Sequence, residues 1–147
     1  MTRTSTMLAV ALFATVVSAP VLSMAADTKP SLYERLGGTG PITAVVGKFV
    51  ANVAADKRIN GYFAKADIPN LKRQLVDQVC QASGGPCTYT GKDMKTTHKG
   101  MKITTAAFNA LVEDLVAALD TFNVPEQEKS ELLSVLGPMN KDIVEVP

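Results

Sequence analysis

The chain contains one histidine, His98, in a short helix-like segment between Gly91 and Gly100. One imidazole is too few for a zinc site, which takes several protein ligands, and no obvious nucleophile accompanies it. A single histidine in an apolar pocket can, however, serve as the axial ligand of a haem iron. A lone histidine in a soluble domain is more often a surface or hydrogen-bonded residue, so the rest of the chain must decide between these interpretations.

Two cysteines, Cys80 and Cys87, bracket a turn-forming stretch that contains Gly84, Gly85 and Pro86. In an oxidising compartment, two thiols that a turn brings close tend to form a disulfide. A metal site is the alternative, but two thiols and one histidine fall short of the four ligands of a structural zinc site. We therefore expect a Cys80–Cys87 disulfide in an exported chain.

The first residues have the pattern of a secretory signal peptide. Arg3 precedes an almost uninterrupted apolar run over residues 7–17, and the small residues of segment 23–25 suit a cleavage site. An uncleaved membrane anchor is the alternative, but the run is shorter than the about 20 residues that a spanning helix needs. We expect residues 1–25 to be a signal peptide, residues 26–147 to form one domain, and the protein to be periplasmic or secreted. No later segment is apolar enough to span a bilayer.

Composition narrows the function of the remaining domain. Removing the signal peptide leaves about 122 residues, enough for one domain with its own core. The net charge is +1, so no large basic field attracts nucleic acid or an anionic membrane. The chain has no tryptophan and few other aromatic residues, which argues against a stacking platform for single strands. We expect no nucleic-acid partner.

Apolar residues recur at three- and four-residue steps along four stretches, which is the pattern of amphipathic helices. The stripes comprise Ile42, Val45, Val46, Phe49, Val50 and Val53; Leu71, Leu75, Val79 and Ala82; Phe108, Leu111, Leu115, Ala118 and Leu119; and Leu132, Leu133, Val135 and Leu136. Pro41, Asp67 and Thr104 stand where helices are expected to begin. Alternation with a period of two never persists, so the sequence predicts an all-α domain of about five helices.

One connection between these helices is long. Residues 84–103 carry no strong apolar stripe, and a connection of that length in a small domain is usually functional. The segment contains His98. A loosely wound segment with the only histidine, opposite a helix with an apolar inner side, is the arrangement that a cofactor sandwich needs.

Five motifs follow one another along the chain in a specific order. They are Leu-Tyr-Glu-Arg-Leu-Gly-Gly at 32–38, Phe49, the pair Tyr62 and Phe63, the turn at 84–86 with Tyr-Thr-Gly at 89–91, and Met-Lys-Thr-Thr-His at 94–98. Their order and spacing resemble those of the group I truncated haemoglobins. These are short globins whose all-α, truncated globin-like fold is a two-over-two helical sandwich around haem. The resemblance covers about residues 31–146 and implies that His98 is the proximal ligand of the haem iron.

A haem b in this position would be a flat apolar disc with two anionic propionates. Apolar residues expected to surround it are Phe49, Phe63, Leu71, Leu75, Met94, Ile103 and Phe108. Tyr89 and lysines such as Lys95 are expected to meet the propionates at the rim. Each of the apolar residues could instead belong to an ordinary core, and the sequence alone does not separate the two roles.

The chain departs from the family on the side where a gas ligand would bind. A tyrosine that many relatives carry is replaced by Val50, and a distal glutamine common in the family is replaced by Leu75. The usual phenylalanine one turn further on is Gln78, and the position from which some relatives bring a second histidine to the iron is Gln74. Gln74 and Gln78 are therefore the remaining candidates for a polar contact to the ligand.

The resemblance implies a haem protein that binds a diatomic gas, namely oxygen, nitric oxide or carbon monoxide, with a reductase as a candidate partner. Nitric oxide dioxygenase chemistry fits the family, although Val50 weakens that expectation. A haem-dependent redox enzyme of the peroxidase or nitrite reductase type is an alternative, but an efficient peroxidase needs a distal acid–base group. The third alternative is a helical interaction domain without haem.

Overall fold

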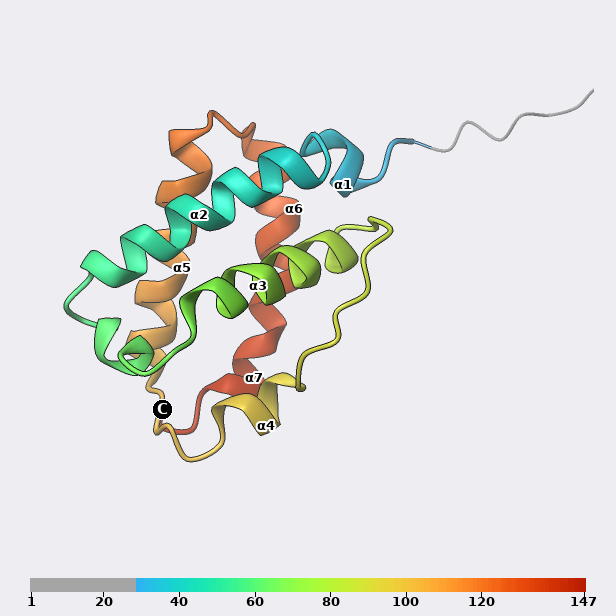
Figure 1. The fold of residues 1–147 in the computed structure, drawn as a ribbon. Helices are drawn as coiled ribbons and strands as arrows, with labels where there is room; N and C mark the ends of the chain where they lie inside the picture. Colours follow the sequence, from blue (N-terminus) through green and yellow to red (C-terminus); the bar gives the residue numbers. More distant parts are fainter. Residues whose placement is uncertain (1–28) are drawn as a thin grey trace, which may run out of the picture.

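The computed structural model describes residues 29–147, and the predicted signal peptide lies outside them. The elements in chain order are α1 (Leu32–Arg35), α2 (Thr39–Ala55), the 3-10 helix η1 (Asn60–Phe63), α3 (Ile68–Ala82), α4 (Met94–His98), α5 (Thr105–Thr121), α6 (Glu126–Leu136), the 3-10 helix η2 (Gly137–Met139) and α7 (Asn140–Ile143) (Figure 1). Residues 29–147 contain no strand, only an isolated bridge between Thr104 and Val146. The all-α prediction is confirmed for this part of the chain.

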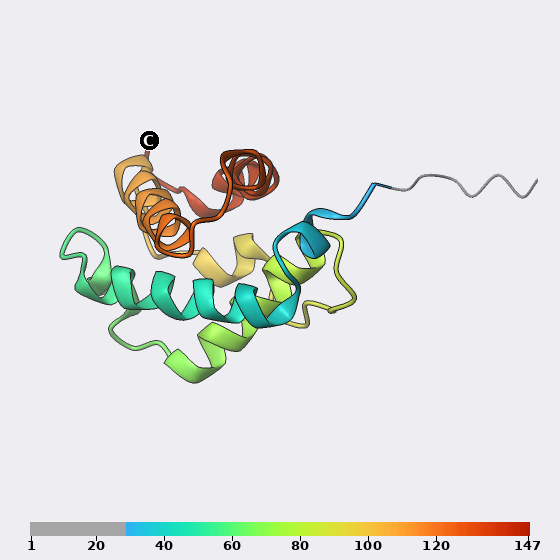
Figure 2. The same cartoon turned by 90° about the horizontal axis from the view of Figure 1, so that it is seen from above.

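Four long helices form two layers, with a short helix between them. Seen from above, α2 and α3 lie in one layer and α5 and α6 in the other (Figure 2). The helix that carries His98, α4, lies between the layers near α7. None of the helices among residues 29–147 is both long enough and apolar enough to cross a bilayer.

Side chains cap the helices at the positions where the sequence predicts their starts. Asp67 accepts a hydrogen bond from the backbone N–H of Asn70 at 3.1 Å, and Thr104 accepts one from Ala107 at 3.0 Å. Each satisfies one of the N–H groups that the first turn of a helix leaves without a partner. Pro41 lies in the first turn of α2, where a missing N–H costs nothing.

The apolar stripe of α2 packs against neighbouring helices in both layers. Val45, Phe49 and Val53 belong to a buried cluster that includes residues of α5 and α6. The second cluster, Ile42, Val46 and Val50, packs against α3. Because both rows are buried, α2 is fixed between α3 and α5, and these helices in turn hold the walls of the space between the layers.

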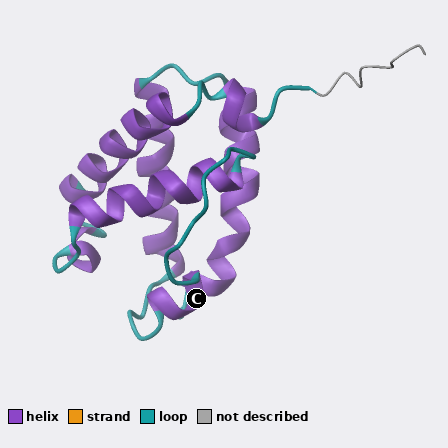
Figure 3. Ribbon diagram, turned by 45° about the vertical axis from the view of Figure 1, so that its right-hand side comes forward, coloured by secondary structure: helices purple, strands orange, loops and turns teal. Residues whose placement is uncertain are grey.

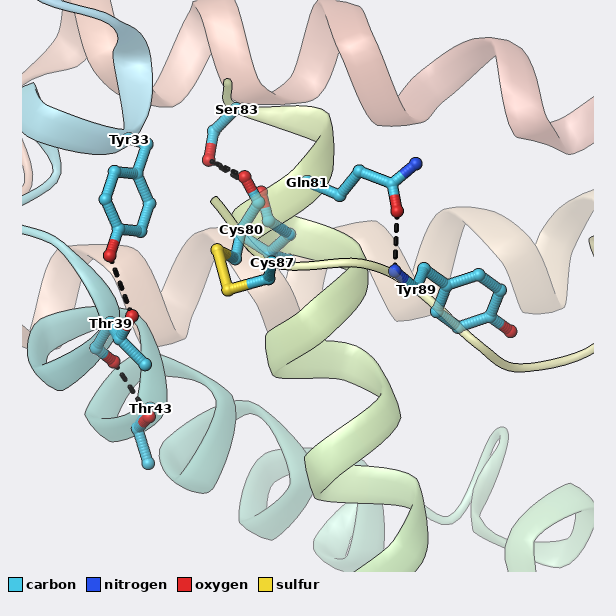
Figure 4. The surroundings of a disulfide bond; sticks show 9 residues. Tyr33, Thr39, Thr43, Cys80, Gln81, Ser83, Cys87 and Tyr89 are labelled. Carbon is cyan, nitrogen blue, oxygen red and sulfur yellow. Dashed lines mark hydrogen bonds between the residues drawn. A yellow bond between two sulfur atoms is a disulfide. The ribbon is translucent and has the colours of Figure 1, made fainter. Parts of the chain in front are cut away.

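An extended linker, residues 83–93, leaves the end of α3 and runs along the side of the molecule to α4 (Figure 3). The structure joins Cys80 to Cys87 by a disulfide at its beginning. Next to it, the side-chain oxygen of Gln81 accepts a hydrogen bond from the backbone N–H of Tyr89 at 2.5 Å (Figure 4). Two ties thus bind the first half of the linker to the last turn of α3.

Candidate functional site

A large cavity of about 800 Å³ lies between the two layers, and its walls are mostly apolar. This volume is in the range of sites that hold cofactors and other small molecules. The predicted site residues that line it are Phe49, Val50, Phe63, Leu71, Gln74, Leu75, Gln78, Tyr89, Met94, His98 and Phe108. They come from α2, η1, α3, the linker, α4 and α5, so one space brings together segments far apart in the sequence.

His98 is oriented by its own helix. Its Nδ1 lies 2.7 Å from the carbonyl oxygen of Met94, one turn earlier in α4. A carbonyl oxygen only accepts, so Nδ1 carries the proton and donates, and Nε2 keeps its lone pair for another partner. The half-buried ring lines the cavity. This is the orientation by which a backbone carbonyl prepares a histidine as a metal ligand.

The start of α4 is fixed by Asp93. Its carboxylate accepts a hydrogen bond from the backbone N–H of Thr96 at 2.9 Å. This bonding lowers the pKa of Asp93 below its ordinary value, because the hydrogen bonds favour the charged form. The cap matters because α4 has only five residues, too few for a helix that is stable by itself.

Gln74 and Gln78 of α3 both line the cavity, but they differ in their contacts. Gln78 donates from Nε2 toward the thioether sulfurs of Met94 and Met139, at 3.5 and 3.3 Å. Gln74 has its side-chain oxygen buried with no hydrogen-bond partner among the described residues. A buried amide group without a partner is costly, which makes Gln74 the side chain of the wall with hydrogen-bonding capacity left to use.

Gln74 also touches the linker. A Cβ atom at Gly91 would overlap the side-chain oxygens of Gln74 and Tyr89, so only glycine lets the linker pass this close to α3. The Tyr89 hydroxyl donates to the carbonyl oxygen of Lys92 at 2.7 Å, and burial raises the pKa of Tyr89. The linker thus forms part of the rim of the cavity.

Two predicted site residues lie elsewhere. Ile103 is buried but is not part of the cavity wall; its carbonyl oxygen accepts hydrogen bonds from the N–H groups of Glu145 and Val146. Lys95 is exposed on α4 and also lies off the wall. These two expectations are corrected because the rotation of α4 and a long-range contact decide which side chains face inward.

Comparison with known proteins decides the family. Residues 31–145 match the family model described as bacterial-like globin. The group 1 truncated hemoglobin GlbN of Mycolicibacterium paratuberculosis is 35% identical over 113 residues, which cover 77% of this chain and 83% of the relative. The chain is a bacterial-like globin of the group 1 truncated haemoglobin family.

Solved structures agree with this assignment. The truncated hemoglobin from Tetrahymena pyriformis in its Fe(III) form has a TM-score of 0.76 and 33% sequence identity, covering 78% of this chain and 98% of that protein. A 2/2 hemoglobin from Synechococcus, solved with covalently attached heme, has a TM-score of 0.71 and 31% identity, with 77% and 95% coverage. The predicted two-over-two globin fold is therefore confirmed.

The residues of this truncated haemoglobin fit a haem. The apolar cavity wall suits the flat ring, and the unprotonated Nε2 of His98 suits the iron. Among residues 29–147 no group of three His, Cys, Asp or Glu side chains is placed to hold a bare metal ion. A prosthetic group that needs one protein ligand matches this donor set better than a metal ion that needs three or four.

The wall residues that sequence reasoning missed include Lys92 and Met139. Lys92, rather than Lys95, is the lysine that lines the cavity. Met139 of η2 lines it as well and contacts Gln78. Neither residue has a signal in the sequence that would have identified it, because Lys92 lies in the linker and Met139 in the short helix η2.

Proposed function

We propose that this truncated haemoglobin holds a haem b through His98 and binds a diatomic gas on the opposite side of the ring. The observation that carries the proposal is the His98 geometry: Nδ1 is held by the Met94 carbonyl, and the ring faces an apolar cavity. Oxygen, nitric oxide and carbon monoxide are the candidate ligands. The family membership supports the same conclusion.

Haem, when bound, supplies the iron that takes the gas, and the chain supplies the surroundings. His98 would bind the iron through Nε2, which its Nδ1 hydrogen bond to Met94 leaves free. Phe49, Leu71 and Phe108 give the cavity an apolar wall, which would keep water away from the bound group. Lys92 and Tyr89, which line the cavity at the linker, are the groups that would meet the anionic propionates.

The haem is proposed to be of the b type, held without covalent bonds. A c-type attachment uses two cysteines directly before a histidine, in the pattern C-x-x-C-H. The two cysteines of this chain lie far from His98 in sequence and are joined to each other in the structure. The thioether links of a c-type haem therefore have no donors here.

A gas such as oxygen binds ferrous iron, so the proposed function includes a reductase as partner. Export to the periplasm or beyond belongs to the proposal too, on the strength of the predicted signal peptide. In that oxidising compartment the Cys80–Cys87 pair would be a disulfide. A peroxidase-type activity has no support from the cavity, because Val50, Leu71 and Leu75 offer no acid–base group.

An absorption spectrum of the purified protein tests the proposal. The protein should show a strong Soret band that shifts when the iron is reduced and carbon monoxide is added. His98→Gly should lose this spectrum or hold haem loosely, and added imidazole should restore it by replacing the lost ring. Lys99→Ala, which changes the exposed neighbour of His98, is the matched control and should behave like the unaltered protein. A His98→Gly protein with an unchanged ferrous spectrum would contradict the proposal.

A further inference from the structure

The segment after α7 returns to the loop that follows α4. The two carboxylate oxygens of Glu145 accept hydrogen bonds from the backbone N–H groups of Gly100 and Lys102, at 2.7 and 2.6 Å. These residues lie two and four positions after His98. One side chain from a segment more than 40 residues away thus holds both ends of a three-residue turn next to the histidine.

The turn needs such a partner. Gly100 and Lys102 have φ angles of 81° and 54°, in the left-handed region, which is unfavourable for a residue with a side chain such as Lys102. The conformation directs their two N–H groups to a single carboxylate. Without Glu145 these donors would bond only to water, and the turn would lose the interaction that fixes its shape.

The main chain adds to this connection. The N–H groups of Glu145 and Val146 both donate to the carbonyl oxygen of Ile103, at 2.9 and 3.1 Å, and the N–H of Thr105 donates to the carbonyl oxygen of Val146 at 3.1 Å. The backbone of segment 144–146 is therefore anchored to the start of α5. Glu145 projects from a fixed base, so it can define where the turn and the end of α4 lie.

We propose that Glu145 is a positioning residue for the proximal histidine: it fixes the turn after α4 and thereby the orientation of His98 toward the haem iron. The proposal rests on the proposed function, because it presupposes that His98 binds the iron. Asp93 fixes the first turn of α4 and Glu145 the turn after it. A helix of five residues held at both ends presents its histidine in one orientation.

The full-length haem-loaded protein allows a direct test with three variants. Glu145→Ala removes both hydrogen bonds, Glu145→Gln keeps an oxygen for one of them, and Glu126→Gln is the matched control. Glu126 is an exposed glutamate of α6 whose partner Lys129 keeps a second bond, to Asp120. The iron–histidine stretching band of the ferrous protein is measured by resonance Raman spectroscopy, and haemin loss is measured by transfer to an excess of apomyoglobin.

We expect Glu145→Ala to shift or broaden the iron–histidine band and to speed haemin loss about three- to tenfold, the effect of losing a hydrogen bond of ordinary strength at an exposed site. Glu145→Gln should lie between this variant and the unaltered protein, and Glu126→Gln should change neither quantity. If Glu145→Ala does not fold, the iron–histidine band of Glu145→Gln tests the proposal in its place.

An unchanged band in both Glu145 variants would overturn the proposal, even with faster haemin loss, because it would reduce Glu145 to a stabilising contact. The failure of the proposed function looks different: either the unaltered protein would bind no haem, or His98→Gly would keep its spectrum.

Discussion

The apolar surroundings of Val50, on the side of the cavity where a gas would bind, predict how fast oxygen leaves the protein. The side chain is 6% exposed and lines the cavity, and Leu71 and Leu75 beside it cannot donate a hydrogen bond either. Oxygen gains partial negative charge when it binds ferrous haem, and a buried donor to a charged acceptor contributes about 1.5–3 kcal/mol. Each 1.4 kcal/mol corresponds to about tenfold in rate or equilibrium constant. A hydroxyl at residue 50 should therefore slow oxygen release about ten- to a hundredfold.

The pair Val50→Tyr and Val50→Phe isolates the hydroxyl group. Both rings crowd the buried cluster around Ile42 and Val46 to the same degree, so any cost of overpacking cancels in their comparison. Stopped-flow measurements should show oxygen leaving Val50→Tyr about ten- to a hundredfold more slowly than Val50→Phe. Carbon monoxide is less polar when bound, and its release should differ little. Equal oxygen rates in the two variants would refute the argument.

Oxygen release from variants of Gln74 and Gln78 in α3 tests the same argument from the opposite direction. Gln78→Leu should leave oxygen release nearly unchanged, since the Gln78 amide nitrogen already donates toward two sulfurs. Gln74→Leu should also have little effect, because the Gln74 side-chain oxygen lies beside Gly91 of the linker and an oxygen of this kind cannot donate a hydrogen bond to the gas. A large acceleration in Gln74→Leu would show instead that the donor has moved along α3, and the wall around Val50 would then not determine oxygen release.

Three further predictions concern stability. Replacing Cys80 and Cys87 by serine should lower the free energy of unfolding by up to about 2–2.5 kcal/mol, the chain-entropy value for so short a loop. Mass spectrometry of the unaltered periplasmic protein, taken without reductant, should show a mass lower by two hydrogens than that of the reduced chain. Two freely alkylated thiols would refute the disulfide. Asp67→Ala should cost about 0.5–2 kcal/mol in urea unfolding through the lost cap of α3, whereas Asp67→Asn should cost little because asparagine caps almost as well. Hydrogen bonds from Ser31 lower the pKa of Glu34 from its ordinary 4.5, so the stability that this carboxylate contributes is present above that pKa and is lost as the pH falls through its lowered folded value. Glu34→Gln should therefore melt below the unaltered protein at pH 7, and the difference should shrink as the pH falls below 4.5; a difference that stays constant on acidification would contradict the assignment.

Local patterns were enough to predict most of the fold. The stripe of α2 is buried as its spacing requires, and Asp67 and Thr104 cap the helices that they precede. These features depend on residues within one or two turns of each other, which is the range over which sequence periodicity carries information. The same holds for His98 and Met94, whose hydrogen bond spans four residues of one helix.

The features that sequence reasoning missed depend on contacts between distant segments. Ile103 has the apolar side chain of a wall residue, but it is buried outside the cavity wall, beside the pairing of Thr104 with Val146. Lys92 and Lys95 carry the same side chain, and only the path of the linker decides that Lys92 reaches the cavity. No residue near either lysine in the sequence distinguishes them.

A helix of only five residues carries the residue on which the proposed function depends. Segment 94–98 is too short to be stable alone, and its two threonines are poor helix formers. Its geometry must therefore come from outside: from the disulfide and Gln81, which tie the linker to α3, and from segment 144–146, which holds the loop on the other side. A glycine-rich connection can carry a haem ligand because it is anchored before and after the histidine. The orientation of His98 is consequently a property of the tertiary structure rather than of α4 itself.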